Sequence, residues 1–278
     1  MAQLGRFNLL SVVEETAQGL YLDAGELGDI LLPNRYVPQN SAIGDRLQVF
    51  IYLDSEDRLL ATTEKPLAQL GDFVSLKVVD VNKAGAFLDW GLPKDLLLPF
   101  GEQLRPYEVG QRVLVHLYQD RASQRICASA KLNKFLDKTP PPYETGEAVE
   151  LIIAGRTDLG QKAIINKSHW GVIFHEEVYQ KLYPGMKVKG FVQKVRRDDK
   201  INLTLTEPGY GKIETLTQQV LTNLQKNDGF MAVTDKSDPA LIKRLFGCSK
   251  KSFKQAIGSL YKQQQIVIEP SGIRLISK

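Results

Sequence analysis

The feature that most constrains the fold is an internal repeat of 66 residues. Sliding the sequence on itself by this offset keeps twelve identities in register, far more than chance produces. The residues of the first module that recur 66 positions later are Gly5, Phe7, Val12, Val13, Gly19, Leu22, Asp23, Leu31, Leu32, Pro33, Gly44 and Asp54. A second offset of 75 carries Gly71, Val74, Gly85, Gly110 and Ile126 onto Gly146, Val149, Gly160, Gly185 and Ile201. The chain therefore contains three copies of one module, the third divergent.

Each module has the pattern of five short strands. In the second module these are residues 73–81, 86–90, 96–99, 112–117 and 125–129, with turn residues between them. Five strands in a module of 66 residues cannot form a well-covered sandwich, but they can close into a small barrel that hides its edges. We therefore expect a mainly β, multidomain protein with three tandem five-stranded barrels of the oligonucleotide-binding (OB) fold.

From Lys212 the apolar period becomes helical. A first helix is predicted from Ile213, Leu216, Val220, Leu221 and Leu224. A second begins with Asp238 as N-cap and Pro239 as first residue, and ends at Gly247. A third, capped by Ser249, places on one stripe Phe253, Ala256, Ile257, Leu260 and Tyr261. A hairpin that pairs Ile266 and Ile268 with Ile273 and Leu275 completes an α+β winged helix.

The domain boundaries follow from these patterns. The length of 278 residues alone suggests about two domains. The repeats raise this number to four, over residues 1–66, 67–138, 143–208 and 209–278. Three consecutive prolines within residues 139–143 predict an extended spacer before the third module.

Composition and termini indicate the class of protein. The N-terminus lacks a basic leader followed by an apolar run, and no stretch approaches the roughly 18 apolar residues of a spanning helix. We expect a soluble, cytoplasmic protein with no membrane partner. Cys127 and Cys248 are far apart in periodic apolar sequence, so we interpret both as structural thiols. His169 and His175 lack a zinc-type arrangement, and neither a metal nor a cofactor is expected.

Basic charge accumulates toward the C-terminus. The formal net charge is +4 overall, with −5 for residues 1–66, +2 for 67–140, +1 for 141–208 and +6 for 209–278. An anionic partner is therefore expected to be held best by the later domains.

The motif order resembles the RNA-binding domain of ribosomal protein S-one. Modules one and two have a strand, then a Gly-aromatic-Leu-Asp strand, then Leu-Leu-Pro, and the second ends with a hairpin that contains Arg-Ile. The whole chain is similar to the conserved virulence factor B family of bacterial RNA-binding proteins, which have tandem barrels and a C-terminal winged helix. This resemblance implies a non-enzymatic protein that binds single-stranded RNA in post-transcriptional regulation.

The resemblance also identifies positions. Tyr21 and Phe87 match the aromatic of the second strand, whereas Leu20 and Ala86 stand where a further aromatic is usual. The histidine that normally ends the third strand is replaced by Pro33 and Pro99, and only His175 lies near that place.

An RNA site needs rings and cations on one surface, because bases stack on aromatic faces while cations follow the phosphates. The predicted RNA-binding residues are Tyr21, Phe87, Trp90, Lys77, Lys83, Arg112, His116, Trp170, His175, Lys187, Lys189, Lys194 and Arg196. For each ring the alternative is a place in the core, and for each cation a solvated face. Modules two and three lead, and the acidic first module ranks last.

The winged helix offers a basic face for auxiliary contact with nucleic acid. Its cations are Lys243, Arg244, Lys250, Lys251, Lys254 and Lys262. Such a face suits phosphate rather than base reading, since apart from Gln255 it has no Asn, Gln or Arg placed to read a base with two hydrogen bonds. Protein docking and a passive structural role are the alternatives, and the ribosome or duplex nucleic acid are further candidate partners.

Two other classes of function are alternatives to RNA binding. A DNA-binding regulator led by the winged helix is the alternative hypothesis. An enzyme such as a nuclease needs clustered carboxylates or an acid–base histidine pair, whereas the acids here are scattered and the histidines do not recur between modules. We therefore expect no catalytic residues.

Overall fold

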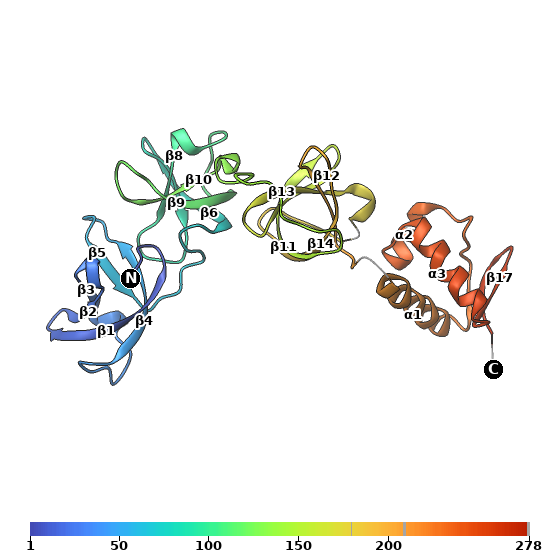
Figure 1. Ribbon diagram of the computed structural model, residues 1–278, viewed down its shortest axis with the longest axis horizontal. Helices are drawn as coiled ribbons and strands as arrows, with labels where there is room; N and C mark the ends of the chain where they lie inside the picture. The colour runs from blue at the N-terminus through green and yellow to red at the C-terminus, as the bar shows by residue number, and fades with distance from the viewer. Residues whose placement is uncertain (179, 208–209, 277–278) are drawn as a thin grey trace. The chain divides into compact units, whose positions relative to one another are not determined.

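The computed structural model describes residues 1–178, 180–207 and 210–276. The chain forms three five-stranded β-barrels followed by a winged helix, which confirms the predicted fold (Figure 1). It divides into two compact units, Met1–Leu136 and Asp137–Lys278. The first unit holds barrels one and two, and the second holds barrel three and the winged helix.

The barrels repeat one strand order. Barrel one consists of β1 (Phe7–Thr16), β2 (Gly19–Asp23), β3 (Asp29–Pro33), β4 (Arg46–Leu53) and β5 (Leu59–Thr62). Barrel two consists of β6 (Phe73–Asn82), β7 (Gly85–Asp89), β8 (Leu96–Pro99), β9 (Arg112–Gln119) and β10 (Ile126–Ser129). Barrel three consists of β11 (Ala148–Thr157), β12 (Gly160–Ile165), β13 (His169–Phe174), β14 (Lys187–Val195) and β15 (Ile201–Thr204). Barrels one and three close through a parallel pairing of the third and fifth strands, and in barrel two β8 and β10 lie side by side.

Short 3-10 helices follow several strands. They are η1 (Gly25–Leu27), η2 (Asn34–Tyr36), η3 (Phe100–Glu102), η4 (Leu132–Lys134) and η5 (His175–Glu177).

One glycine that recurs in all three modules has a structural reason. The second strand of each barrel begins with a glycine at φ of about 150°, namely Gly19, Gly85 and Gly160. A Cβ there would lie 2.0–2.3 Å from a carbonyl oxygen of the third strand. Only glycine accepts both that backbone conformation and that approach, so the tight pairing of these strands depends on it.

Barrels one and two share an apolar core through strand β4. Because side chains alternate along a strand, Val49 and Ile51 point into barrel one, whereas Phe50 and Tyr52 pack against barrel two. The ring of Phe50 meets Trp90 edge-on, at 5.8 Å between centroids.

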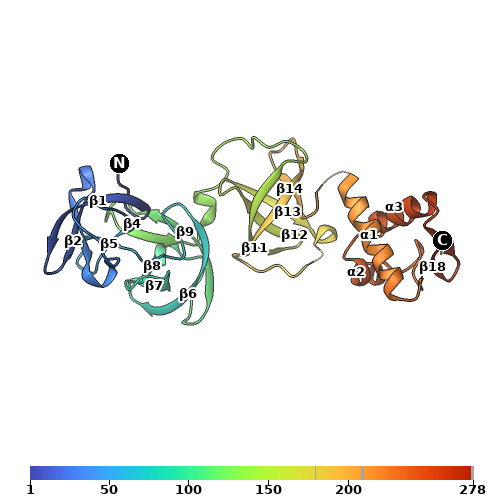
Figure 2. The ribbon, with the colours of Figure 1, turned by 90° about the horizontal axis from the view of Figure 1, so that it is seen from below.

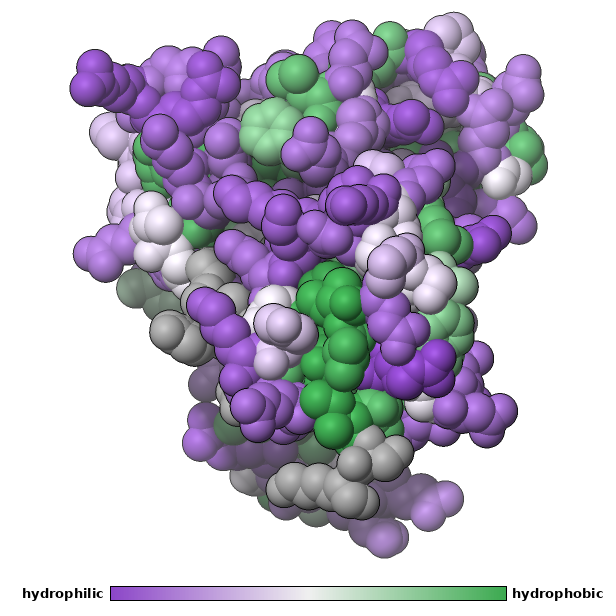
Figure 3. Space-filling model, turned by 90° about the vertical axis from the view of Figure 1, so that its right-hand side faces the viewer, coloured by the Kyte–Doolittle hydropathy of each residue, from purple (hydrophilic) through white to green (hydrophobic). Residues whose placement is uncertain are grey.

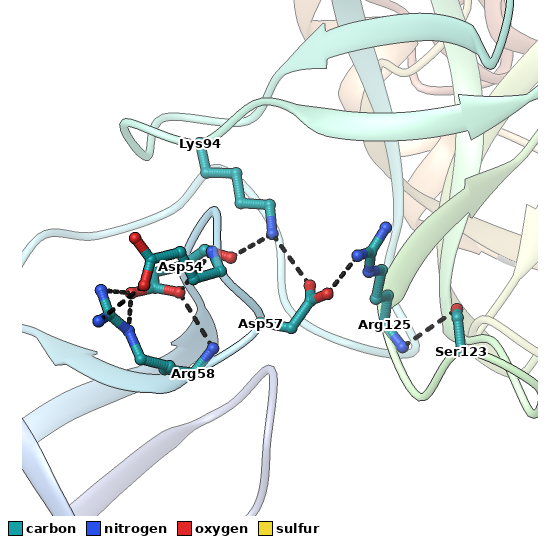
Figure 4. A network of polar contacts seen from close by, with 7 residues as sticks. Asp54, Asp57, Arg58, Lys94, Ser123 and Arg125 are labelled. Atoms are coloured by element: carbon teal, nitrogen blue, oxygen red, sulfur yellow. Dashed lines mark hydrogen bonds and ion pairs between the residues drawn. The ribbon is translucent and has the colours of Figure 1, made fainter.

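Polar contacts border this shared core (Figure 4). Asp57, in the β4–β5 turn of barrel one, pairs with Arg125 and Lys94 of barrel two. The same turn holds a pair between Asp54 and Arg58, at 2.7 Å. The turn that joins the last two strands of barrel one is therefore occupied by contacts with its neighbour.

The winged helix comprises α1 (Tyr210–Lys226), β16 (Phe230–Met231), α2 (Pro239–Phe246), α3 (Lys250–Lys262), β17 (Ile266–Glu269) and β18 (Gly272–Leu275) (Figures 1 and 2). The predicted caps are confirmed, since Asp238 accepts from the Ala240 N–H and Ser249 from the Ser252 N–H. Gly247 ends α2 in the left-handed conformation. None of the described helices is long and apolar enough to span a membrane.

Two details of the winged helix differ from expectation. Tyr261 is exposed rather than part of the buried stripe of α3, which ends at Leu260. The short strand β16 pairs with β18 and was not predicted, because two residues show no alternation. Ile213 lies outside the residues whose side chains are described.

Candidate nucleic-acid interface

The register of barrel three places rings and a cation on one outer face. Strands β12 and β13 pair so that Ile164 lies opposite Trp170, Lys162 opposite Val172, and Gly160 opposite Phe174. The alternate residues of both strands point into the barrel core. Trp170, Lys162 and Phe174 therefore share the outer surface, and all three are half-buried.

Lys162 and Trp170 form a cation–π pair on this face. The Lys162 ammonium nitrogen lies 3.8 Å from the centre of the Trp170 ring. Partial burial lowers the pKa of Lys162 below its ordinary value. The lysine is thus held at the ring by packing rather than extended into solvent.

A pocket of about 670 Å³ opens over these residues. This volume lies within the range of roughly 300–1,000 Å³ typical of ligand sites. We call it the Trp170 pocket; it is lined by residues 137–141, Leu159, Lys162, residues 169–172, Phe174, Arg196 and residues 198–202. The β11–β12 turn, the β12–β13 face and the β14–β15 turn thus all contribute to it.

The β14–β15 turn brings cations to the rim of the pocket. Arg196 and Lys200 both pair with Asp198, at 3.1 and 3.2 Å. All three side chains are exposed. One carboxylate therefore positions two cations that an incoming phosphate can share.

The structure unites only some of the predicted residues of barrel three. Trp170 and Arg196 line the Trp170 pocket. Lys194 is exposed but does not line it, and Lys187 and Lys189 line a different hollow of about 620 Å³ between β11 and β14. His175 is exposed at the start of η5, one residue beyond the outer face of β12 and β13, where Phe174 holds the position expected for it.

Lys162 was missed by sequence reasoning, although a signal for it existed. The offset of 75 residues that aligns modules two and three places Lys162 on Phe87, the aromatic of the second strand. In barrel three a cation thus replaces that ring, and the ring of the site comes from Trp170 on the next strand.

The corresponding face of barrel two is smaller and more acidic. Half-buried Phe87 lines a hollow of about 190 Å³ together with Lys94, Asp95 and Arg125. Burial and the neighbouring Asp89 and Asp80 raise the pKa of Asp95. Lys94 and Arg125 pair with Asp57 of barrel one.

Three predicted cations of barrel two lie away from this hollow. Lys77, Lys83 and Arg112 are exposed, and none of them lines it. Arg112 donates to the backbone oxygen of Ser75.

Two predictions in barrel two are corrected. Trp90 is only 3% exposed, lies in the core shared with barrel one, and donates its indole N–H to the Lys94 carbonyl. His116 is flanked by Phe73 and Phe135, with ring centroids at 4.4 and 4.0 Å. Neither ring presents a face to a base, because a second packed element covers each of them.

Barrel one presents an acidic counterpart of this face. Tyr21 is half-buried on β2 opposite Leu31. Asp23 and Asp29 stand directly opposite each other at the end of the same strands. Like charges so placed disfavour a phosphate.

The winged helix exposes most of its predicted cations. Lys243, Arg244, Lys251, Lys254 and Lys262 are exposed, and Lys254 pairs with Asp235 at 3.5 Å. Lys250 is half-buried and donates to the Ser237 carbonyl. In the view of Figure 3 most of the visible surface is hydrophilic, with a narrow hydrophobic patch near the centre and smaller ones elsewhere.

Among the described residues, no group of three or more His, Cys, Asp or Glu side chains could hold a metal ion. The chemistry that this part of the chain offers at the Trp170 pocket is stacking, cationic contact and hydrogen bonding.

Comparisons with known proteins match these parts. The family model described as the S1 domain matches residues 4–64 and 70–131, and the CvfB-like winged helix domain matches residues 218–275. The uncharacterized protein YitL of Bacillus subtilis is 30% identical over 276 residues, covering 94% of this chain and 89% of YitL. Conserved virulence factor B of Staphylococcus saprophyticus is 28% identical over 243 residues, covering 85% and 81%. A crystal structure of a multidomain protein with nucleic acid binding domains, from Streptococcus pneumoniae, is 26% identical over 98% of each chain, with a TM-score of 0.41.

Proposed function

Because the chain belongs to the conserved virulence factor B family, we propose that it binds single-stranded RNA, and that the Trp170 pocket is its main site. The S1 and winged-helix matches support a nucleic-acid-binding role for the chain as a whole. We further propose that the nucleic acid is RNA and that the chain acts in post-transcriptional regulation.

The observation that carries the proposal is the joining of a ring and cations on the outer face of barrel three. OB-type barrels bind oligonucleotides on the face of strands two and three, between the first and last turns. Here that face carries Trp170 with Lys162, and the last turn carries Arg196 and Lys200. A base stacks on Trp170 while the adjoining phosphates contact the turn.

The other domains act as auxiliaries. Barrel two contributes Phe87, and the winged helix contributes the exposed cations Lys251, Lys254 and Lys262, which strengthen binding through phosphate contacts. Such contacts make the affinity fall with salt, because bound phosphates release their counterions.

The test is fluorescence anisotropy with a labelled, unstructured RNA of about 12 nucleotides, which is within the site sizes of such barrels. Loss of one stacked base costs roughly 1–3 kcal/mol, so Trp170→Ala should raise Kd about 5- to 150-fold. Lys200→Gln should reduce the salt dependence of binding. Lys181→Gln, on the same barrel but outside the pocket, is the matched control.

Two results would contradict the proposal. Unchanged RNA affinity of the Trp170→Ala protein would remove the pocket as the site. A preference for duplex DNA that persists after deletion of residues 1–208 would favour a DNA-binding regulator led by the winged helix.

A further inference from the structure

The segment that precedes barrel three is fixed against it rather than free. The Asp137 N–H donates to the Ser168 carbonyl, and the Trp170 N–H donates to the Asp137 carboxylate, each at 2.9 Å. Residues 137–141 line one side of the Trp170 pocket. We call them the proline wall, because Pro140 and Pro141 have a restricted φ and no N–H to donate.

His169 holds this wall through hydrogen bonds. Its side chain is only 3% exposed, and its Nε2 lies 2.8 Å from the Thr139 carbonyl oxygen. A carbonyl oxygen only accepts, so Nε2 carries the hydrogen and Nδ1 accepts from the Tyr143 hydroxyl at 3.0 Å. Both ring nitrogens are thus used to hold the segment, and the two rings also meet edge-on at 5.3 Å.

His169 and Trp170 are neighbours on β13, and their side chains therefore point to opposite sides of the sheet. Trp170 faces the pocket, while His169 holds the wall beside it. We propose that His169 is a positioning residue for RNA binding, an inference that rests on the proposed function. It keeps the proline wall in place, so that single-stranded RNA enters a preformed site.

The expected effect follows from preorganisation. A segment that is already ordered loses no conformational freedom when the ligand arrives, whereas a loosened one must be ordered at the expense of affinity. Releasing the wall should therefore weaken RNA binding although none of the groups proposed to contact RNA has changed.

The test uses the full chain with His169→Phe, which keeps an aromatic ring and removes both hydrogen bonds. Tryptic cleavage after Lys138 in the native protein reports release of the wall, because cleavage requires local opening. We expect His169→Phe to raise the cleavage rate about tenfold and Kd for RNA about five- to tenfold. Trp170→Ala should raise Kd without changing the cleavage rate.

A double-mutant cycle separates a positioning role of His169 from a general loss of stability. Pro140→Gly with Pro141→Gly loosens the wall independently, so its effect on Kd and that of His169→Phe should not add. Tyr143→Phe, which removes only the Nδ1 bond, replaces His169→Phe if that variant does not fold, with effects in the same direction.

The outcomes are distinguishable. An unchanged cleavage rate, additive effects, or a Kd within about twofold of the parent despite a weakened Trp170→Ala protein would overturn the positioning role. Normal RNA binding by Trp170→Ala would instead count against the proposed function.

Discussion

At the scale of single residues, burial decides what an ionisable or aromatic group can do. His116 lies between two phenylalanine rings, and its Nδ1 is buried without a hydrogen-bond partner among the described residues. Burial lowers its pKa from 6.5 to about 4. The imidazole is therefore neutral in the folded protein at ordinary pH, and it acts as a packing group.

This shift predicts how stability depends on pH. The unfolded chain binds a proton at His116 near pH 6.5 and the folded chain only near pH 4. Between these values protonation of the unfolded chain therefore lowers the free energy of unfolding. The stabilisation is complete above pH 6.5 and is lost as the pH falls toward 4. Urea titrations should show a smaller decline in unfolding free energy from pH 7 to pH 5 for His116→Phe than for the parent. A decline for His116→Phe as large as that of the parent would refute this role of His116.

The sequence located rings on strands but could not tell which outer faces meet another domain. Trp90 and Trp170 both lie on or just after an early strand, yet one is sealed by barrel one and the other lines a pocket. That difference is set by contacts between modules, which periodicity within a module does not contain. Lys162 could have been found from the 75-residue offset, whereas the proline wall needed the structure.

At the scale of elements, the start of the second strand is a tightly constrained point of each barrel. The repeat predicted the strands of module two to within a few residues, because turns and alternation are local signals. The caps of α2 and α3 were predictable for the same reason.

Gly85 should be intolerant of any side chain. A Cβ on Gly85 would lie 2.3 Å from the Leu98 carbonyl oxygen, at a φ of 150°. We expect Gly85→Ala to lower the unfolding free energy by about 2–4 kcal/mol, through strain and displaced backbone. Gly101→Ala in the same barrel meets open space and serves as the control in the denaturant titration. Equal midpoints for the two variants would refute the explanation.

Gly258 gives the opposite prediction. It lies inside α3, and a Cβ there would meet nothing within 4 Å. Gly258→Ala should therefore raise the unfolding free energy of the winged helix by about 0.5–1 kcal/mol, as for glycine in a helix interior. Thermal denaturation checks this, and a lower midpoint would mean that this face of α3 has contacts in solution.

At the scale of the molecule, the contacts that join two barrels and the proposed RNA-binding site lie in different parts of the chain. Barrels one and two are joined through Phe50, Tyr52 and Trp90, with the Asp57 contacts at the border. The third barrel carries the open pocket.

The two tryptophans should separate these properties. Trp90→Ala removes a large ring from the shared core and should cost about 3–5 kcal/mol of unfolding free energy, with a smaller loss for Trp90→Phe. Under conditions where the variant stays folded, its RNA affinity should match that of the parent. In the same denaturation and anisotropy measurements, Trp170→Ala should lower the RNA affinity and leave the unfolding free energy close to that of the parent. A loss of RNA affinity in folded Trp90→Phe protein would refute the separation.

The outward rings of β4 also matter during biosynthesis. Phe50 and Tyr52 leave the ribosome before Trp90 and Ile126, the residues of barrel two that cover the same core. Because domains fold from the N-terminus during translation, the nascent first barrel carries an uncovered apolar strip until its neighbour has been synthesised. A pause in translation between the two modules would prolong that exposure and favour aggregation or chaperone capture.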